Sequence, residues 1–191
     1  KTVLVMPSIS ITAQKQGMVG ITVNPSFDWN LDARNASTGS FASTYTLATN
    51  QSNAIFARFI SGRGTNISNC TRTYFRFDTS SVPGIVTSAQ LVVYTSFFSF
   101  TNVDVIPIES FAFGINGTSN LTNNDFSNID YGTDYSSQIP WSVSPGNNTF
   151  SLNATAINDI NNNQFLNLAL IDYEYDYQNL PLPLGQQNIA S

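Results

Sequence analysis

The sequence predicts an all-β protein: a jelly-roll-like antiparallel β-sandwich with extra N-terminal strands and one short helical turn. Short runs of β-branched and aromatic residues recur along the 191 residues, with Gly, Pro and Asn between them. Only one segment has apolar residues at helical spacing. Charged residues make up only 10%, while Asn, Ser and Thr number 23, 23 and 19, a composition that suits strands and turns and weakens helices.

The first part of the chain contains three short strand-like runs separated by Pro and Gly, at residues 1–6, 9–13 and 17–23. We therefore predict that residues 1–25 form additional strands, an arm for assembly or attachment, and that residues 26–191 form the sandwich domain. Further strands are expected at 45–49 and 53–60, where apolar and aromatic residues recur.

The clearest pattern is RTYFRFDTSSVPGIVTSAQLVVYTS, residues 72–96, which predicts two strands joined by the turn TSSVPG. In the first strand Phe75 and Phe77 share one face, and alternation places Arg72, Arg76 and Asp78 on the other. The simplest role of these charged residues is structural, with Arg76 pairing with an acid to brace the sheet surface.

The rest of the chain predicts strands at 103–108, 148–152 and 165–177, a long polar region at 110–148, one or two helical turns within 153–162, and a Pro-rich loop at the end. Asn153 or Thr155 is available as the helix cap. The last strand carries a conflict, because the face that begins with three leucines continues into acidic residues. Burying unpaired carboxylates is costly, so we expect a bulge or a strand end near Asp172.

The composition argues against several classes of function. Histidine is absent and Cys70 is the single cysteine, so a triad hydrolase lacks its usual base and no internal disulfide can form. The net charge is −5 and no basic residue follows Arg76, which argues against nucleic acid as a partner. No apolar run is long enough for membrane insertion. The acids offer no spacing that singles out a glycosidase pair, so we expect no enzymatic activity.

Two candidate sites remain, each with a structural alternative. Ca²⁺ prefers clustered oxygen ligands, and it is the one cofactor that we consider. Its candidate site consists of Asp172, Glu174 and Asp176. The alternative is that these acids form a solvated sheet end. Loop acids would have to complete such a site: Asp125, Asp130 and Asp134. Aromatic faces pack against sugar rings, which makes four residues candidates for glycan contact: Trp29, Trp141, Tyr131 and Tyr135. Burial in the core is the alternative for the tryptophans.

The segment RTYFRFDTSSVPGIVTSAQLVVY resembles the core motif of the DNRLRE-type β-sandwich domains. The matched positions are Arg72, Phe75, Phe77, Asp78, Ser80, Ser81, Pro83, Ser88, Ala89, Leu91 and Tyr94. FSLNATAINDINNNQFLNLALIDYEYD and DWNLDARN give weaker support. The family's usual final strand is not found before the chain stops at NIAS, so that strand either lies outside this sequence or is supplied by another chain or segment.

The resemblance implies a carbohydrate-binding-module-like jelly roll. Such domains occur in secreted bacterial surface proteins and, as a similar variant, in bacteriophage structural proteins. The expected function is therefore a virion structural and adhesive module, such as a head decoration, fibre or tail appendage. At the virion exterior it would contact other virion proteins or copies of itself as a homo-oligomer, and it could also contact glycans on a cell surface. The alternative is a secreted or cell-surface bacterial carbohydrate-binding module.

Overall fold

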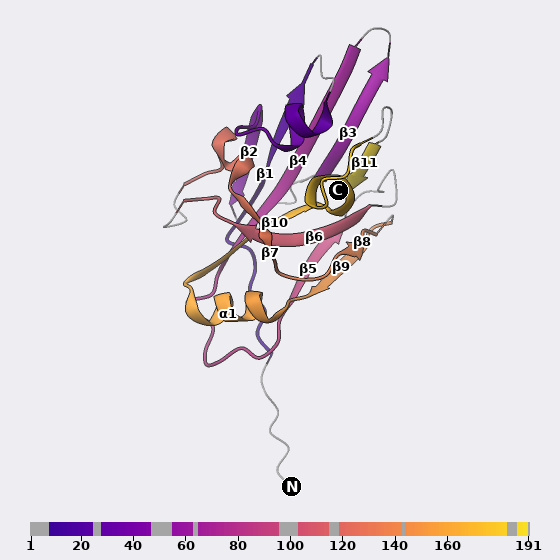
Figure 1. Cartoon of the computed structure of the whole chain (residues 1–191). Coiled ribbons are helices and arrows are strands. Elements are labelled where there is room, and N and C mark those ends of the chain that lie inside the picture. Colours follow the sequence, from indigo (N-terminus) through magenta and orange to yellow (C-terminus); the bar gives the residue numbers. More distant parts are fainter. Residues whose placement is uncertain are drawn as a thin grey trace.

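The structure, a computed structural model, describes residues 8–24, 28–46, 55–62, 65–95, 103–114, 119–142, 144–182 and 187–190 (Figure 1). The strands are β1 (Lys15–Val23), β2 (Phe41–Thr46), β3 (Ile55–Gly62), β4 (Thr65–Asp78), β5 (Gln90–Thr95), β6 (Asp104–Ser110), β7 (Ile129–Asp134), β8 (Ile139–Pro140), β9 (Gly146–Ser151), β10 (Phe165–Asp172) and β11 (Gln187–Ala190). The helical segments are η1 (Asn30–Arg34), η2 (Asn123–Ser127), α1 (Ala154–Asn162) and η3 (Tyr173–Tyr177). The predicted all-β class is confirmed.

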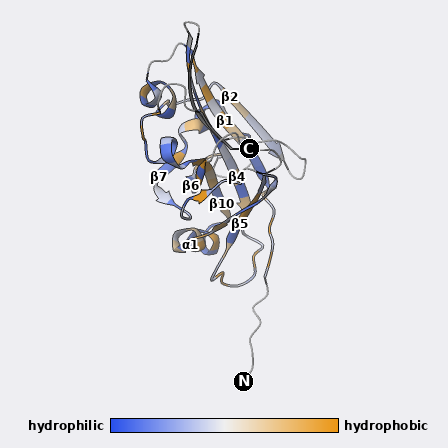
Figure 2. Cartoon of the chain, turned by 90° about the vertical axis from the view of Figure 1, so that its right-hand side faces the viewer, coloured by the Kyte–Doolittle hydropathy of each residue, from blue (hydrophilic) through white to orange (hydrophobic). Residues whose placement is uncertain are grey.

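The described strands form one large and one small antiparallel sheet. The main path of the large sheet runs β11-β3-β4-β10-β6-β7, with β1 joining β4 to β2 and β8 added to β6; β5 and β9 form the small sheet. The long strand β4 organises this arrangement, because β3, β10 and β1 all pair with parts of it. Figure 2 shows β1, β2 and β4 running together as one layer, with α1 and β5 near its lower end.

Both faces of β4 and β10 are buried. Residues such as Tyr74 and Ala169 belong to one apolar cluster, which the segments around η1 and η2 cover. Alternate residues, such as Phe75 and Leu168, belong to a second cluster, which α1, β5 and β9 complete. The charged face of β4 is therefore not the braced sheet surface that the alternation predicted: Arg72 and Arg76 are 1% and 0% exposed.

Several sequence predictions hold and others need correction. β10 ends at Asp172, as the conflict between leucines and acids predicted, and the π-helical turn η3 follows. The α1 helix is capped by Asn153, whose Oδ1 accepts a hydrogen bond from the Ala156 N–H at 3.1 Å. By contrast, β4 and β5 do not pair as a hairpin; they lie in different sheets, and the turn that contains Gly84 at φ +77° connects them.

The chain ends also differ from expectation. Residues 9–13 form no strand, and β11, in the tail that we expected to be a loop, pairs with β3. The predicted strand at 1–6 lies outside the described residues. The long polar region at 110–148 contains η2, β7 and β8 in addition to the start of β9. Within the described part of the chain, no helix has the length and apolarity needed to cross a membrane.

A buried ion pair lies in the first apolar cluster. The Arg72 Nε and Nη2 atoms donate to the two carboxylate oxygens of Asp176, both at 2.8 Å, and both side chains are almost wholly buried. Arg72 also donates to the backbone carbonyls of Phe126 and Arg34 and to the Tyr131 hydroxyl. Its guanidinium lies 4.0 Å from the centre of the Phe126 ring.

Asp176 has further partners, at its carboxylate and at its backbone carbonyl. The Tyr131 hydroxyl donates to Asp176 Oδ1 at 2.7 Å, and Arg34 Nε donates to the Asp176 backbone carbonyl at 2.6 Å. Burial by itself would raise the pKa of Asp176, but the Arg72 charge and the side-chain hydrogen bonds outweigh it and hold the pKa below its usual value. The carboxylate is therefore ionised and well supplied with donors in the folded protein.

Arg76 differs from Arg72 in having no carboxylate at hydrogen-bonding distance in the described part of the chain. Its Nη1 donates to the Gly114 carbonyl and to Asn167 Oδ1, both at 3.3 Å, while its Nε and Nη2 have no hydrogen-bond partner among the described residues. Its guanidinium lies 3.6 Å from the centre of the Phe165 ring. Burial accordingly lowers the pKa of Arg76, although Asp78 partly offsets this effect.

Replacing the two arginines should have unequal effects on stability. Arg72→Met leaves the Asp176 carboxylate buried with Arg34, whose Nε lies 3.9 Å from Oδ1, as its remaining cation, and we expect a loss of about 3–5 kcal/mol in the free energy of unfolding. The matched variant Arg76→Met removes a buried charge that lacks a carboxylate partner, so the expected loss is about 1 kcal/mol or less. Urea unfolding of both variants measures the difference. Equal losses in the free energy of unfolding would show that breaking the Arg72–Asp176 pair costs no more than removing Arg76.

The pH dependence of stability should also depend on Asp176. Its pKa is lower in the folded than in the unfolded chain, so its contribution is complete above about pH 4 and is lost as the pH falls toward the folded-state pKa. In Asp176→Asn, the free energy of unfolding should be lower at neutral pH and should fall less steeply in acid. Urea unfolding over this pH range tests the expectation. An equally steep fall in the free energy of unfolding for the native protein and the variant in acid would contradict it.

Candidate functional site

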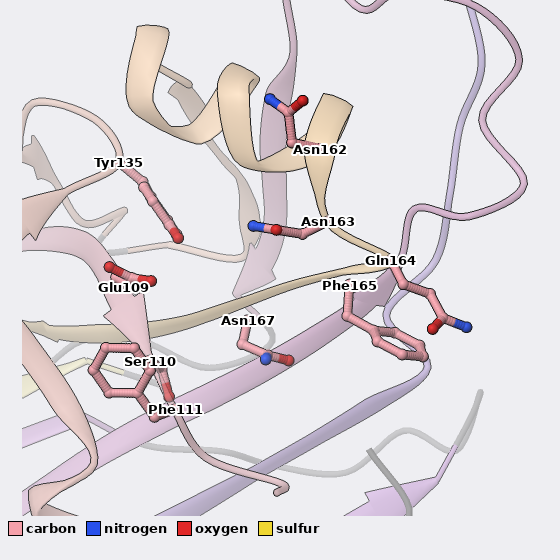
Figure 3. A pocket seen from close by; sticks show the side chains of 9 residues that line it. All are labelled: Glu109, Ser110, Phe111, Tyr135, Asn162, Asn163, Gln164, Phe165 and Asn167. Atoms are coloured by element: carbon pink, nitrogen blue, oxygen red, sulfur yellow. The ribbon is translucent and has the colours of Figure 1, made fainter. Parts of the chain in front are cut away.

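A pocket of about 430 Å³ opens where β6, β10 and the end of α1 come together (Figure 3). It is the candidate site, and its lining is mainly polar. The lining residues are Glu109, Ser110, Phe111, Tyr135, Asn162, Asn163, Gln164, Phe165 and Asn167. Figure 3 shows Glu109, Tyr135 and Asn163 extending toward a shared space, whereas Gln164 points away from it.

The pocket exists because two neighbouring strands separate. β6 pairs with β10 as far as the Glu109–Leu168 position, while β10 extends to Phe165 along β4. A register shift on the other edge of β6 accompanies this separation: Ile108 lies opposite Asp134, but Glu109 lies opposite Asp130. The residues between these two positions of β7 form a bulge, a feature that re-aims side chains.

Glu109 is the only charged residue among the described residues that line the pocket. Its side chain is partly buried, and this burial, followed by repulsion from Asp159 and Asp130, raises the pKa of its carboxyl group. Asp130 itself accepts hydrogen bonds from the Thr133 hydroxyl and the Gly132 N–H, which lower its pKa and keep it ionised. The electrostatic environment of Glu109 is therefore negative.

The hydrogen bonds around the pocket use many of its donors. The Tyr135 hydroxyl donates to Asp159 Oδ2 at 2.7 Å, and Asn163 Nδ2 donates to Asp159 Oδ1 at 3.2 Å. Asn162 Nδ2 donates to the Asn158 carbonyl at 2.8 Å. Tyr135 and Asn162 have their donors engaged and Asn163 has one of its two engaged, while the hydroxyl or amide oxygen of each keeps the capacity to accept a hydrogen bond.

Two phenylalanines give the pocket an apolar component. Phe111 follows the end of β6 and is 57% exposed, although it lines the pocket. Phe165 begins β10, and its ring covers the Arg76 guanidinium. A mixed lining of amides, one carboxylate and exposed aromatic surface can hold a hydroxylated ligand that also has an apolar face.

The aromatic residues predicted for glycan contact are buried or lie elsewhere. Trp29 and Trp141 are 3% and 5% exposed, and Trp29 Nε1 donates to the Tyr175 carbonyl at 3.3 Å. Tyr131 donates to Asp176 in the core. Of the four residues, only Tyr135 lines the pocket, and most of its side chain is buried. The prediction of an exposed tryptophan platform is therefore wrong, because both indoles fill the core instead.

The acids predicted for Ca²⁺ do not come together either. Asp172 accepts a hydrogen bond from the Tyr175 N–H at 2.7 Å, Asp176 pairs with Arg72, and Glu174 is exposed. Among the described residues, no group of three or more His, Cys, Asp or Glu side chains is placed to hold a metal ion.

The loop acids that would have completed a calcium site are engaged with nearby polar residues. The pairs are Asp125 with Thr122, Asp130 with Thr133, and Asp134 with Asn153. Each carboxylate therefore accepts hydrogen bonds from polar residues close to it, and the three do not come together with the acids at the end of β10.

Two features of the sequence mark the pocket, although neither was among the predicted site residues. Glu109 is one of only two glutamates, and NNNQF at 161–165 places four consecutive amide side chains at the end of α1 and just before β10. Their proximity to Glu109 depends on the pairing of β6 with β10, which local patterns do not specify.

Two comparisons with known proteins were negative. No family model matches the chain, and no curated protein matches it. The resemblance to the DNRLRE-type domains therefore stays a prediction.

The raised pKa of Glu109 has a consequence for stability. Ionising this group is harder in the folded than in the unfolded chain, so the ionised carboxylate makes the fold less stable as the pH rises through and above its unfolded-state pKa. Glu109→Gln should therefore raise the free energy of unfolding at neutral pH, by a few tenths of a kcal/mol because solvent screens the repulsion. The gain should vanish in acid. Glu174→Gln, which removes an exposed carboxylate, is the control; a stability loss in Glu109→Gln alone would contradict the expectation.

Proposed function

We propose that this chain is a non-enzymatic adhesive module that binds a glycan in the pocket beside β6 and β10. The observation that carries the proposal is the combination of amide side chains, Glu109 and the exposed ring of Phe111 around one pocket. Sugar hydroxyls form hydrogen bonds with amides and carboxylates, and the C–H face of a sugar packs against aromatic surface. A volume of about 430 Å³ is adequate for one or two sugar units.

The non-enzymatic part of the proposal rests on the chemistry of the lining. Glycoside hydrolysis ordinarily uses two carboxyl groups on either side of the scissile bond, whereas Glu109 is the only carboxyl group among the described residues that line this pocket. Cys70 is buried, and burial raises the pKa of its thiol well above the usual value, which disfavours the nucleophilic thiolate. These features support binding rather than turnover.

The biological setting of this adhesion is inferred from the sequence resemblance. A module on the exterior of a virion, assembled with other virion proteins or with copies of itself, is our leading proposal. A secreted or surface-attached bacterial carbohydrate-binding module is the alternative. In both settings the pocket would contact a surface glycan, so one binding experiment serves both.

Removing the exposed ring should weaken glycan binding. We expect Phe111→Ala to reduce the affinity for a bound oligosaccharide about tenfold, because the sugar loses its apolar contact. Isothermal titration calorimetry after a glycan array screen measures this change. Tyr94→Ala is the matched control, since Tyr94 is an exposed aromatic residue on β5 that does not line the pocket. If only the Tyr94 variant lost binding, the glycan surface would lie on the small sheet and the proposed site would be wrong.

A further inference from the structure

We infer that the pocket prefers glycans that contain an amino sugar with a free, protonated amine. The inference rests on the proposed glycan function and adds the chemical class of the ligand. Its starting point is that the described lining contains one carboxylate, Glu109, and no lysine or arginine. An ammonium group placed beside this carboxylate would form a charge-assisted hydrogen bond, which is roughly twice as strong as a neutral one.

The surrounding charges favour a cation at this point. The groups that act on Glu109 electrostatically are Asp159 from α1 and Asp130 from β7, and both are acidic. Arg76 is a cation that contacts the lining at two residues: its guanidinium lies against Phe165, which Figure 3 shows on the opposite side of the pocket from Glu109, and its Nη1 donates to Asn167 Oδ1. No cation in the described part of the chain forms an ion pair with Glu109, so that role is open to a ligand.

The hydrogen-bonding capacity of the pocket favours the same class of ligand. Tyr135, Asn162 and Asn163 use donors on Asp159 and Asn158, so each retains an oxygen that can accept. Asn163 also keeps one N–H group, and Asn167, whose Oδ1 accepts from Arg76, keeps its amide donors, so the lining offers Glu109 and these oxygens as acceptors beside a few donors. An ammonium group has three donors and no acceptor, and hydroxyl groups can also donate. A sugar that carries both kinds of group matches this lining.

The rim adds selectivity. The exposed Phe111 ring lies two residues after Glu109 and also lines the pocket. An aromatic face attracts a cation as well as the apolar face of a sugar. An acidic sugar would instead meet the negative field of Glu109, Asp130 and Asp159 and would be repelled. An N-acetylated sugar keeps the ring but lacks the charge, so it should bind more weakly than the free amine.

Three β-1,4-linked oligosaccharides of equal length test the inference by calorimetry at a mildly acidic pH, where the amines of the glucosamine oligomer are protonated: one of glucosamine, one of N-acetylglucosamine and one of glucose. We expect the glucosamine oligomer to bind about tenfold more tightly than either neutral oligomer. Equal affinity for the three oligomers would overturn the amine inference and leave the proposed glycan function intact. Absence of binding to any glycan would overturn both.

Two further ligands separate the contributions of charge and ring. A polygalacturonate oligomer should not bind measurably, and binding as tight as that of the glucosamine oligomer would overturn the inference. A simple diamine without a sugar ring should bind at least about tenfold more weakly than the glucosamine oligomer, because it lacks the ring contacts. A diamine that bound equally well would show that the pocket selects any amine rather than an amino sugar.

The variant Glu109→Gln should abolish the preference, so that the glucosamine oligomer binds no more tightly than the neutral oligomers. Glu174→Gln is the matched control, because it removes the same charge from an exposed position outside the pocket lining. The preference should persist in that variant, and its loss there would assign the effect to overall charge instead of to the pocket. If Glu109→Gln fails to fold, the ranking of the three oligomers on the native chain decides the question.

Discussion

The fold is organised around one buried charge pair. Arg72 and Asp176 are 104 positions apart in the sequence, and each would be costly to bury alone. Their contact therefore commits β4 and η3 to one arrangement. The remaining donors of Arg72 reach carbonyls in η1 and η2, and the Tyr131 hydroxyl attaches β7. Segments that share no continuous strand pairing are thus connected through a single guanidinium group. Selection of one arrangement, rather than a large net gain in stability, is our hypothesis for why the pair is buried.

The geometry of the pocket depends on the same network. Tyr131 reaches Asp176 from the bulged part of β7, between Asp130 and Asp134. This bulge is also the register shift that places Glu109 opposite Asp130. One irregularity thus brings a tyrosine to the buried ion pair and an aspartate close to the pocket carboxylate. A regular β6–β7 ladder would not place these side chains in the same relation. The negative charge around the pocket and the contact of Tyr131 with the buried ion pair consequently depend on the same bulge in β7.

The parts of this fold that could be predicted are those with local causes. The alternating strands, the Asn153 cap and the strand end at Asp172 all follow from neighbouring residues. The partner of Asp176 could not be found in this way, because it depends on contacts between distant segments. The same limit applies to Trp29. The polar residues around it in the sequence did not decide whether its side chain is exposed or buried, and the fold places its indole in the core. Glu109 was visible as a rare residue, yet only the β6–β10 pairing brings it to the amides that follow α1.

The distribution of positive charge connects the core to the proposed site. The chain has seven basic residues, and three of them, Arg34, Arg72 and Arg76, are buried in the described structure. Cations that could neutralise surface acids are therefore scarce. Glu109 lies near two aspartates, in a place where its ionisation is unfavourable, and a glutamine there would avoid the cost. A partly buried carboxylate with a perturbed pKa in a pocket is a recurrent feature of functional sites. A cationic ligand would relieve this repulsion, which gives binding at this position a source of free energy that a neutral ligand lacks.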